Sequence, residues 1–472
     1  MTIIGLEIND TGILAAGGSP AELLDLDGQL RESPGFALPR KKGLLVGKAA
    51  ESKAHLFPRQ ILNHFWDQLN TEPLEQTGRH SPQNHAEIVY RHLSSIWQQL
   101  QSHGDEIVMA VPSFFDREQL GLILGITQEL EMPVKGFVPL SLAASADPSP
   151  EKMLMFLDIH LHRIEVIYLE QDDHLTVRDS ATTADQGLHH LYRGLVEMIA
   201  QQFVRLTRYD PFHQAASEQE LYDRLPGILS HLQHNSSMIF EIAGGTSPYS
   251  ITLQRDEIIH NAAPIYSEVL RLIKRMQNKR GTDQTPLALQ LSHRMARLPG
   301  CQENLTTLND VDIIELDRGA AARGVPQIWH ELAARGNNQG ISFFTNRPWQ
   351  HKQQKVDHGS TTVTPKSNIP THLLYGSIAY PISEKPLTIG CAKDSEGNHI
   401  MVSGETTGVY PRHCTVERRG SEVILTDTNA RGTYVDEKQV NGSIRLKLGQ
   451  IIRVGTPGET LQLIACIQTL SE

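Results

Sequence analysis

Apolar residues follow two different periods over the first 300 positions of the chain. Short apolar runs predict strands over 2–8, 44–46, 107–111, 153–159 and 287–291, and residues 163–170 alternate as the hairpin partner of 153–159. Apolar residues three or four positions apart predict a helix that begins at Ser81 and further helices over 117–130, 187–207, 217–234 and 256–276. A second pair of strands is expected at 236–242 and 250–253. Strands that alternate with helices are typical of an α/β fold.

The pattern changes after residue 348. Residues 349–370 are rich in Gln, Lys, Ser, Thr and Pro and contain few aliphatic side chains, so a flexible linker is expected. Over 371–468, short apolar runs are separated by turn residues about every eight to twelve positions, which is typical of a β-sandwich. The chain is therefore expected to contain an α/β domain over 1–348, a linker over 349–370 and an all-β domain over 371–472.

Composition narrows the range of partners and compartments. The 472 residues include 39% hydrophobic ones and carry a formal net charge of −11, which argues against binding to nucleic acid or to an anionic membrane surface. No apolar run approaches the roughly 20 residues of a membrane-spanning helix, and the N-terminal MTIIGLEIND does not have the pattern of a signal peptide. The four cysteines show no CxxC spacing, as expected for a reducing compartment. A cytoplasmic protein without membrane insertion is predicted.

Several segments resemble one family of ATPases. IIGLEINDTGIL at 3–14 resembles the first phosphate loop of actin-like ATPases, which usually reads GIDLGTTNS. Residues 33–62, 107–146, 251–258 and 297–300 resemble further segments of the heat-shock 70 family in the same order, so the likeness spans about 330 residues. The resemblance implies an actin-like ATPase fold with two lobes, each a mixed sheet flanked by helices, around a central cleft for ATP.

The phosphate loops depart from the family pattern. The metal-side Asp of the family corresponds to Glu7, and the glycine that follows corresponds to Asn9. The second loop, DLGGGT in the family, reads DIHLHR here, which keeps Asp158 but replaces all three glycines. A backbone approaches a phosphate closely only where no side chain intervenes. Glu7 and Asp158 are therefore interpreted as the remnant of a nucleotide or cation cleft.

The catalytic and adenosine-binding positions are altered as well. The family's GGSTRIP reads HRMARLP, which places His293 and Arg294 where a nucleotide would lie. The hydrolytic Glu corresponds to Val138, which cannot orient a water molecule or accept its proton. We therefore expect a pseudo-ATPase without catalytic residues and without ATP or Mg²⁺ as a cofactor.

Histidines at the same cleft leave a metal site as an alternative. His160 and His162 are two positions apart and would share a strand face with Asp158, and the resemblance places His293 nearby. Imidazoles together with carboxylates are ligands for Zn²⁺. The simpler interpretation, which is preferred, is that polar residues fill a vacated cleft and that no metal is bound.

The C-terminal part resembles a forkhead-associated (FHA) domain. Residues 386–402, 409–417, 425–436 and 446–455 resemble the four blocks of that family in order. Family members usually bind phosphothreonine through an Arg after a glycine and a Ser in the second block, because a bidentate Arg recognises phosphate. Here the Arg is Cys391 and the Ser is Tyr410. Because the usual phosphate contacts are replaced, the module is expected to bind protein without requiring phosphate. Tyr410 and the nearby cations Arg412 and Arg431 are the residues expected to contact the partner.

These expectations combine into one predicted function and two alternatives. The predicted function is that of a non-enzymatic scaffold or adaptor that binds protein partners through its actin-like lobes and its altered FHA-like domain. The first alternative is an ATP-binding chaperone-type ATPase. The second is a signalling adaptor that reads phosphothreonine.

Overall fold

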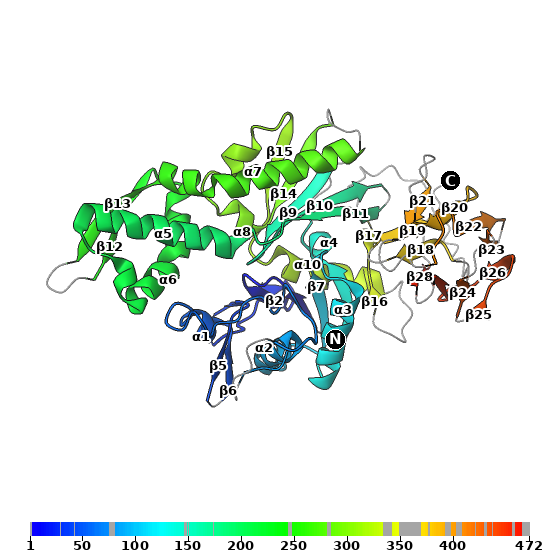
Figure 1. Ribbon diagram of the computed structural model, residues 1–472, viewed down its shortest axis with the longest axis horizontal. Helices are drawn as coiled ribbons and strands as arrows, with labels where there is room; N and C mark the ends of the chain where they lie inside the picture. Colours follow the sequence, from blue (N-terminus) through cyan, green and yellow to red (C-terminus); the bar gives the residue numbers. More distant parts are fainter. Residues whose placement is uncertain are drawn as a thin grey trace. The chain divides into compact units, whose positions relative to one another are not determined.

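The structure is a computed structural model in which the chain divides into two compact units, Met1–His351 and Lys352–Glu472 (Figure 1). It describes residues 2–464 except 29, 42, 75–80, 146–148, 150, 173, 244–247, 281–284, 334–341, 349–369, 376–377, 392–397, 403–407, 421, 429–431, 437 and 456–457. The predicted linker 349–370 thus lies, apart from Pro370, outside the described residues, and so does Arg431. Within the described part of the chain, no helix is long and apolar enough to cross a membrane.

The first unit is a mixed α/β structure built on two large sheets. The first sheet has the strand order β16-β8-β7-β1-β2-β3, and β4 also pairs with β2. Its strands are β1 (Ile3–Glu7), β2 (Ile13–Gly17), β3 (Glu22–Leu23), β4 (Glu32–Ser33), β7 (Glu106–Val111), β8 (Val134–Pro139) and β16 (Ser342–Phe343). β1 runs antiparallel to β2 and parallel to β7, and β7 runs parallel to β8.

The second sheet repeats this connectivity. Its order is β15-β14-β9-β10-β11-β17, with β9 antiparallel to β10 and parallel to β14. Its strands are β9 (Met153–Ile159), β10 (Ile164–Gln171), β11 (His174–Thr182), β14 (Leu287–Leu291), β15 (Val311–Glu315) and β17 (Asn346–Pro348). In both sheets the first strand in the sequence pairs with an antiparallel strand on one side and with a parallel strand on the other: β1 lies between β2 and β7, and β9 lies between β10 and β14.

Helices and two small hairpins complete this unit. The helices are α1 (Lys48–Glu51), α2 (His85–Leu100), α3 (Arg117–Glu129), α4 (Leu140–Ala144), α5 (Leu188–Thr207), η1 (Pro211–His213, a 3-10 turn), α6 (Ala215–Leu232), α7 (Arg255–Arg280), α8 (His293–Ala296), α9 (Cys301–Leu305) and α10 (Ala320–Ala333). The hairpins are β5 (Ala37–Arg40) with β6 (Gly43–Val46), and β12 (Ser237–Ile242) with β13 (Tyr249–Gln254). Figure 1 shows α5, α6 and the β12–β13 hairpin extending together beyond the second sheet.

The apolar pattern explains most of these elements. The predicted strands and helices are confirmed with small shifts at their ends, because their apolar faces form three cores within the unit. One start is wrong: the helix predicted to begin at Ser81 begins at His85, because the Asn84 side chain caps it by accepting a hydrogen bond from the Glu87 N–H at 2.9 Å. α3 begins at a capping box formed by Asp116 and Gln119.

The second unit is all-β and contains two sheets. One has the order β19-β18-β28-β27-β24-β25, and the other has the order β21-β20-β22-β23-β26. Their strands are β18 (His372–Tyr375), β19 (Ile378–Pro381), β20 (Leu387–Gly390), β21 (His399–Met401), β22 (Cys414–Arg419), β23 (Glu422–Asp427), β24 (Thr433–Val435), β25 (Lys438–Gln439), β26 (Ser443–Leu446), β27 (Ile451–Val454) and β28 (Glu459–Ile464). Both sheets contribute to one hydrophobic core, in which Leu373 and Leu461 of the first lie with Ile389 and Val416 of the second.

Candidate functional site

Two equivalent loops of the first unit bind each other. Residues 8–12 connect the two central strands β1 and β2, and residues 160–163 connect β9 and β10 in the same way. The Asn9 Nδ2 donates to Asp158 Oδ2 at 2.9 Å and to the Ile159 carbonyl at 3.2 Å. In return, the Leu161 N–H donates to Asp10 Oδ1 at 2.7 Å. The side chain at the family's glycine position therefore holds the Asp158 carboxylate that the sequence singled out.

Glu7, the other remnant carboxylate, forms a buried ion pair with Arg294. Arg294 lies on α8, directly after β14, and its Nη1 donates to Glu7 Oε1 at 2.7 Å. Its Nη2 donates to the Gly12 carbonyl at 2.6 Å. Burial acts to lower the pKa of the guanidinium, but Glu7 and the nearby carboxylates outweigh burial and raise it, so the pair is ionic. Arg294 thereby links α8 to the β1–β2 loop.

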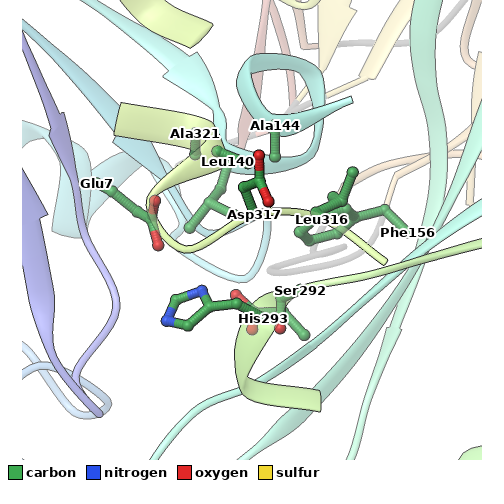
Figure 2. Close-up of a pocket in the computed structure, with 11 residues that line it drawn as sticks. Glu7, Leu140, Ala144, Phe156, Ser292, His293, Leu316, Asp317 and Ala321 are labelled. Carbon is green, nitrogen blue, oxygen red and sulfur yellow. The ribbon is translucent and has the colours of Figure 1, made fainter. Parts of the chain in front are cut away.

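His293 lines a small pocket with both remnant carboxylates. The pocket holds about 10 Å³, which is room for about one water molecule. Its lining comprises Glu7, Leu140, Ala144, Phe156, Asp158, Ser292, His293, Leu316, Asp317, Ala320 and Ala321. Figure 2 shows Glu7 approaching from β1 and His293 from α8. Burial, followed by the Arg294 charge, strongly lowers the pKa of His293, so its imidazole is neutral at physiological pH.

The other two histidines of the proposed metal set lie elsewhere. His160 is buried between Asp10 and Glu165. His162 stacks on His64 with ring centroids 3.5 Å apart, and its Nε2 lies 3.0 Å from the Asn63 carbonyl. Burial, together with the neighbouring imidazoles, lowers the pKa of His162 to about 4.

The expectation that His160 and His162 share a strand face is wrong, because β9 ends at Ile159 and both residues lie in the hairpin loop. Their side chains therefore do not have to alternate with that of Asp158 as strand residues would. Over the residues that the structure describes, no three His, Cys, Asp or Glu side chains are placed to hold a metal ion.

In the second unit, two of the residues predicted to contact a partner, Tyr410 and Arg412, lie on one turn. Tyr410 is 53% exposed, and its N–H lies 3.2 Å from the His413 Nδ1 that accepts it. The Sγ of Cys391 contacts the Val409 carbonyl at 3.2 Å, so the thiol faces the backbone of this turn. Arg412 is exposed on the same turn. The turn presents an aromatic ring and a cation, whereas Arg431 belongs to the residues that are not described.

The close packing of the 409–413 turn on β20 explains why position 390 needs a glycine. A Cβ added at this position would lie 2.0 Å from the Pro411 carbonyl oxygen, so only glycine allows the turn to approach the strand this closely. The glycine therefore supports the shape of the turn.

Sequence reasoning missed Asp10, Glu165 and Asp67, which complete the first unit's polar network. Glu165 accepts a hydrogen bond from the Ser113 N–H at 3.0 Å, and Asp67 pairs with Arg163. A signal for Glu165 was present, because it is the one charged residue in the apolar run Ile164–Leu169 of β10 and is fully buried. Asp67 gave no such signal, since it follows no strand or helix pattern.

Comparison with family models finds none that matches the chain, and comparison with curated proteins finds no significant match.

Proposed function

We propose that the chain is a non-enzymatic scaffold whose first unit has an actin-like ATPase fold with a self-occupied nucleotide cleft. The repeated strand order supports the fold assignment, because it gives two mixed sheets of similar connectivity, and the resemblance implies a mixed sheet in each of its two lobes. The facing loops 8–12 and 160–163 then correspond to the two phosphate loops.

The main support for the proposal is that N–H groups of these two loops already donate hydrogen bonds within the protein. A polyphosphate is bound by unpaired backbone N–H groups. Here the Thr11 N–H donates to Asn9 Oδ1, and the Leu161 N–H donates to Asp10. The Gly12 and His160 N–H groups donate to backbone carbonyls.

The charge of the site argues against a nucleotide as well. Asp10 and Asp158 are buried at the loops, and the nearest buried cation, Arg294, is already paired with Glu7. An incoming polyphosphate would meet carboxylates and would have to break this pair. The pocket beside Glu7 and Asp158 has room for about one water molecule and Arg294 is already paired, so the cleft supports a structural role.

The second unit supports the adaptor part of the proposal. Two sheets of six and five strands around one core fit an FHA-like β-sandwich. With Cys391 turned to the backbone, the usual bidentate phosphate contact has no counterpart at that position. An exposed aromatic ring such as that of Tyr410 is typical of the anchors at protein interfaces.

Titration of the full chain with MgATP tests the proposed cleft. We expect no rise in melting temperature at millimolar nucleotide, because a ligand that binds only the native state must stabilise it. We also expect no hydrolysis above that of an Asp158→Asn variant, which serves as the blank. A dose-dependent rise in melting temperature, or hydrolysis that disappears in Asp158→Asn, would favour the chaperone-type ATPase instead.

A further inference from the structure

His160 is buried between two carboxylates that come from different sheets. Its side chain is 1% exposed, with Nδ1 3.7 Å from Asp10 Oδ1 and Nε2 3.7 Å from Glu165 Oε2. Asp10 belongs to the β1–β2 loop of the first sheet, whereas Glu165 lies on β10 of the second. The Phe114 ring meets the imidazole edge-on at 4.9 Å between centroids and covers it on that side.

Each ring nitrogen of His160 faces a carboxylate. The protonation state of the ring therefore decides whether both nitrogens can direct an N–H group at their partners. A neutral imidazole has one N–H group, so its other nitrogen would direct a lone pair at a carboxylate in a buried place. An imidazolium has two N–H groups and serves both partners. At 3.7 Å, each nitrogen–oxygen pair is longer than a hydrogen bond but within the distance of a direct ion pair. The three groups therefore interact directly.

Backbone hydrogen bonds hold both carboxylates in position from the opposite sheet. Asp10 accepts from the Leu161 N–H of the second sheet's loop, and Glu165 accepts from the Ser113 N–H, which follows β7 of the first sheet. Within the described residues, Glu165 Oε2 and both His160 nitrogens have no hydrogen-bond partner. Their close contacts are the 3.7 Å separations between His160 and the two carboxylates. The positions of the two carboxylates thus favour a proton on each nitrogen of His160.

The surrounding charges favour the cation. On β9, Asp158 is a third carboxylate near the ring. In the loop of His160 itself, Arg163 is paired with Asp67, and His162 is neutral at physiological pH, as its pKa of about 4 indicates. Burial acts to lower the pKa of His160, but the close contact with Glu165 and the charges of Asp158 and Asp10 outweigh burial and raise it. Burial raises the pKa of Asp10, which also faces Asp67 and Arg294.

We propose that His160 is held as an imidazolium and forms an ionic link between the two sheets, so that the contact between loops 8–12 and 160–163 is controlled by pH. The link is a pH-dependent ionic contact between the two loops that would bind phosphate in relatives of this fold. It goes beyond the proposed function and does not depend on it, because a chain that binds nucleotide could still carry a charged His160.

The sign of the pH dependence follows from the raised pKa. A histidine in the unfolded chain has a pKa of about 6.5. The stabilisation from His160 is complete below that value and is lost as the pH rises through the higher pKa of the folded state. The loop contact is therefore expected to weaken on the alkaline side.

Nuclear magnetic resonance of the full chain with ¹⁵N-labelled histidine rings tests the charge directly. Above a pH of about 8, solvent-exposed histidines are neutral, and one imidazolium signal is expected to persist. His160→Gln should remove it, whereas the control His103→Gln, which changes an exposed histidine, should leave it in place. If every imidazole is neutral at this pH, the proposal is overturned.

A second variant keeps the test decisive if His160→Gln does not fold. Glu165→Gln retains His160 but removes one facing carboxylate, so the persistent imidazolium should titrate at least one pH unit lower, a tenfold change in its proton affinity. An unchanged titration of that signal in Glu165→Gln would show that the proton belongs to another histidine, which would also overturn the proposal.

Discussion

Arg294 carries a full charge in a position where it is only 8% exposed. Burying a guanidinium and a carboxylate costs several kcal/mol per ion, and the contacts with Glu7 and the Gly12 carbonyl offset this cost only while both partners are present. Removing one partner leaves an unpaired buried charge. The stability of the first unit should therefore respond differently to the loss of one side chain and to the loss of both.

Arg294→Ala is expected to lower the free energy of unfolding by about 3–5 kcal/mol, because Glu7 is left buried and unpaired. The double variant Glu7→Gln with Arg294→Met should lose much less, since no net charge stays buried. Urea unfolding of the full chain measures both. The matched control is Arg297→Ala, which changes an exposed arginine at the end of the same helix and should alter stability by less than about 0.5 kcal/mol. A single variant as stable as the double would contradict this account.

The sequence predicted only part of this chemistry at the residue scale. Loss of the family's glycines indicated that His293 and Arg294 enter the cleft, and the structure places both beside Glu7. The partner of Arg294 could not be predicted, because Glu7 lies 287 positions earlier and no local pattern connects the two. The same holds for His160, whose carboxylates come from the β1–β2 loop and from the opposite strand of its own hairpin.

At the scale of elements, α10 packs against β1 and α4 through glycines. A Cβ on Gly324 would lie 1.8 Å from the Ala143 carbonyl oxygen of α4, and a Cβ on Gly5 would lie 2.1 Å from the Ala322 carbonyl oxygen of α10. Both contacts are too close for any side chain. α10 thus reaches the first sheet only where glycine allows its backbone to approach.

Gly324→Ala is expected to destabilise the chain by about 1–3 kcal/mol, because a methyl group at this contact forces backbone to move. Gly121→Ala is the matched control: it lies within α3, where a Cβ would meet nothing within 4 Å, and should stabilise the chain by roughly 0.5–1 kcal/mol. Denaturant unfolding of the two variants should therefore shift in opposite directions. If both variants lose stability, replacement of glycine by alanine is destabilising in general, and the loss in Gly324→Ala would not be due to the α10 contact.

α10 also shows where prediction of elements from the sequence ends. Gly324 and Pro326 interrupt its helical period, so the pattern did not predict it. β8, β11 and β15 were missed for a related reason: they are short or partly exposed, and their positions in the sheets depend on neighbours distant in the sequence. The long, strongly periodic helices α5 and α7 were predicted because one face of each is fully apolar.

At the scale of the whole molecule, the two units have separate cores. The core of the second unit consists of residues of that unit, and the cores of the first unit consist of residues of the first unit. The 409–413 turn depends on contacts within its own unit, among them the Thr428 hydroxyl, which donates to the carbonyls of Arg412 and His413. Hydrogen bonds that shape the turn are therefore supplied by the second unit itself.

The last prediction concerns partner binding by the full chain at this turn. Immobilised full chain should retain the same protein partners from a lysate before and after phosphatase treatment, because Cys391, whose thiol faces the backbone, and Tyr410 do not supply a bidentate phosphate contact. Tyr410→Ala should weaken retention at least tenfold, as expected for loss of an aromatic interface anchor. Ile444→Ala is the control, since it changes another exposed apolar side chain of the same unit, on β26. Partners that are lost after phosphatase treatment and in an Arg412→Ala variant would instead identify a phosphothreonine reader with a rebuilt anion site.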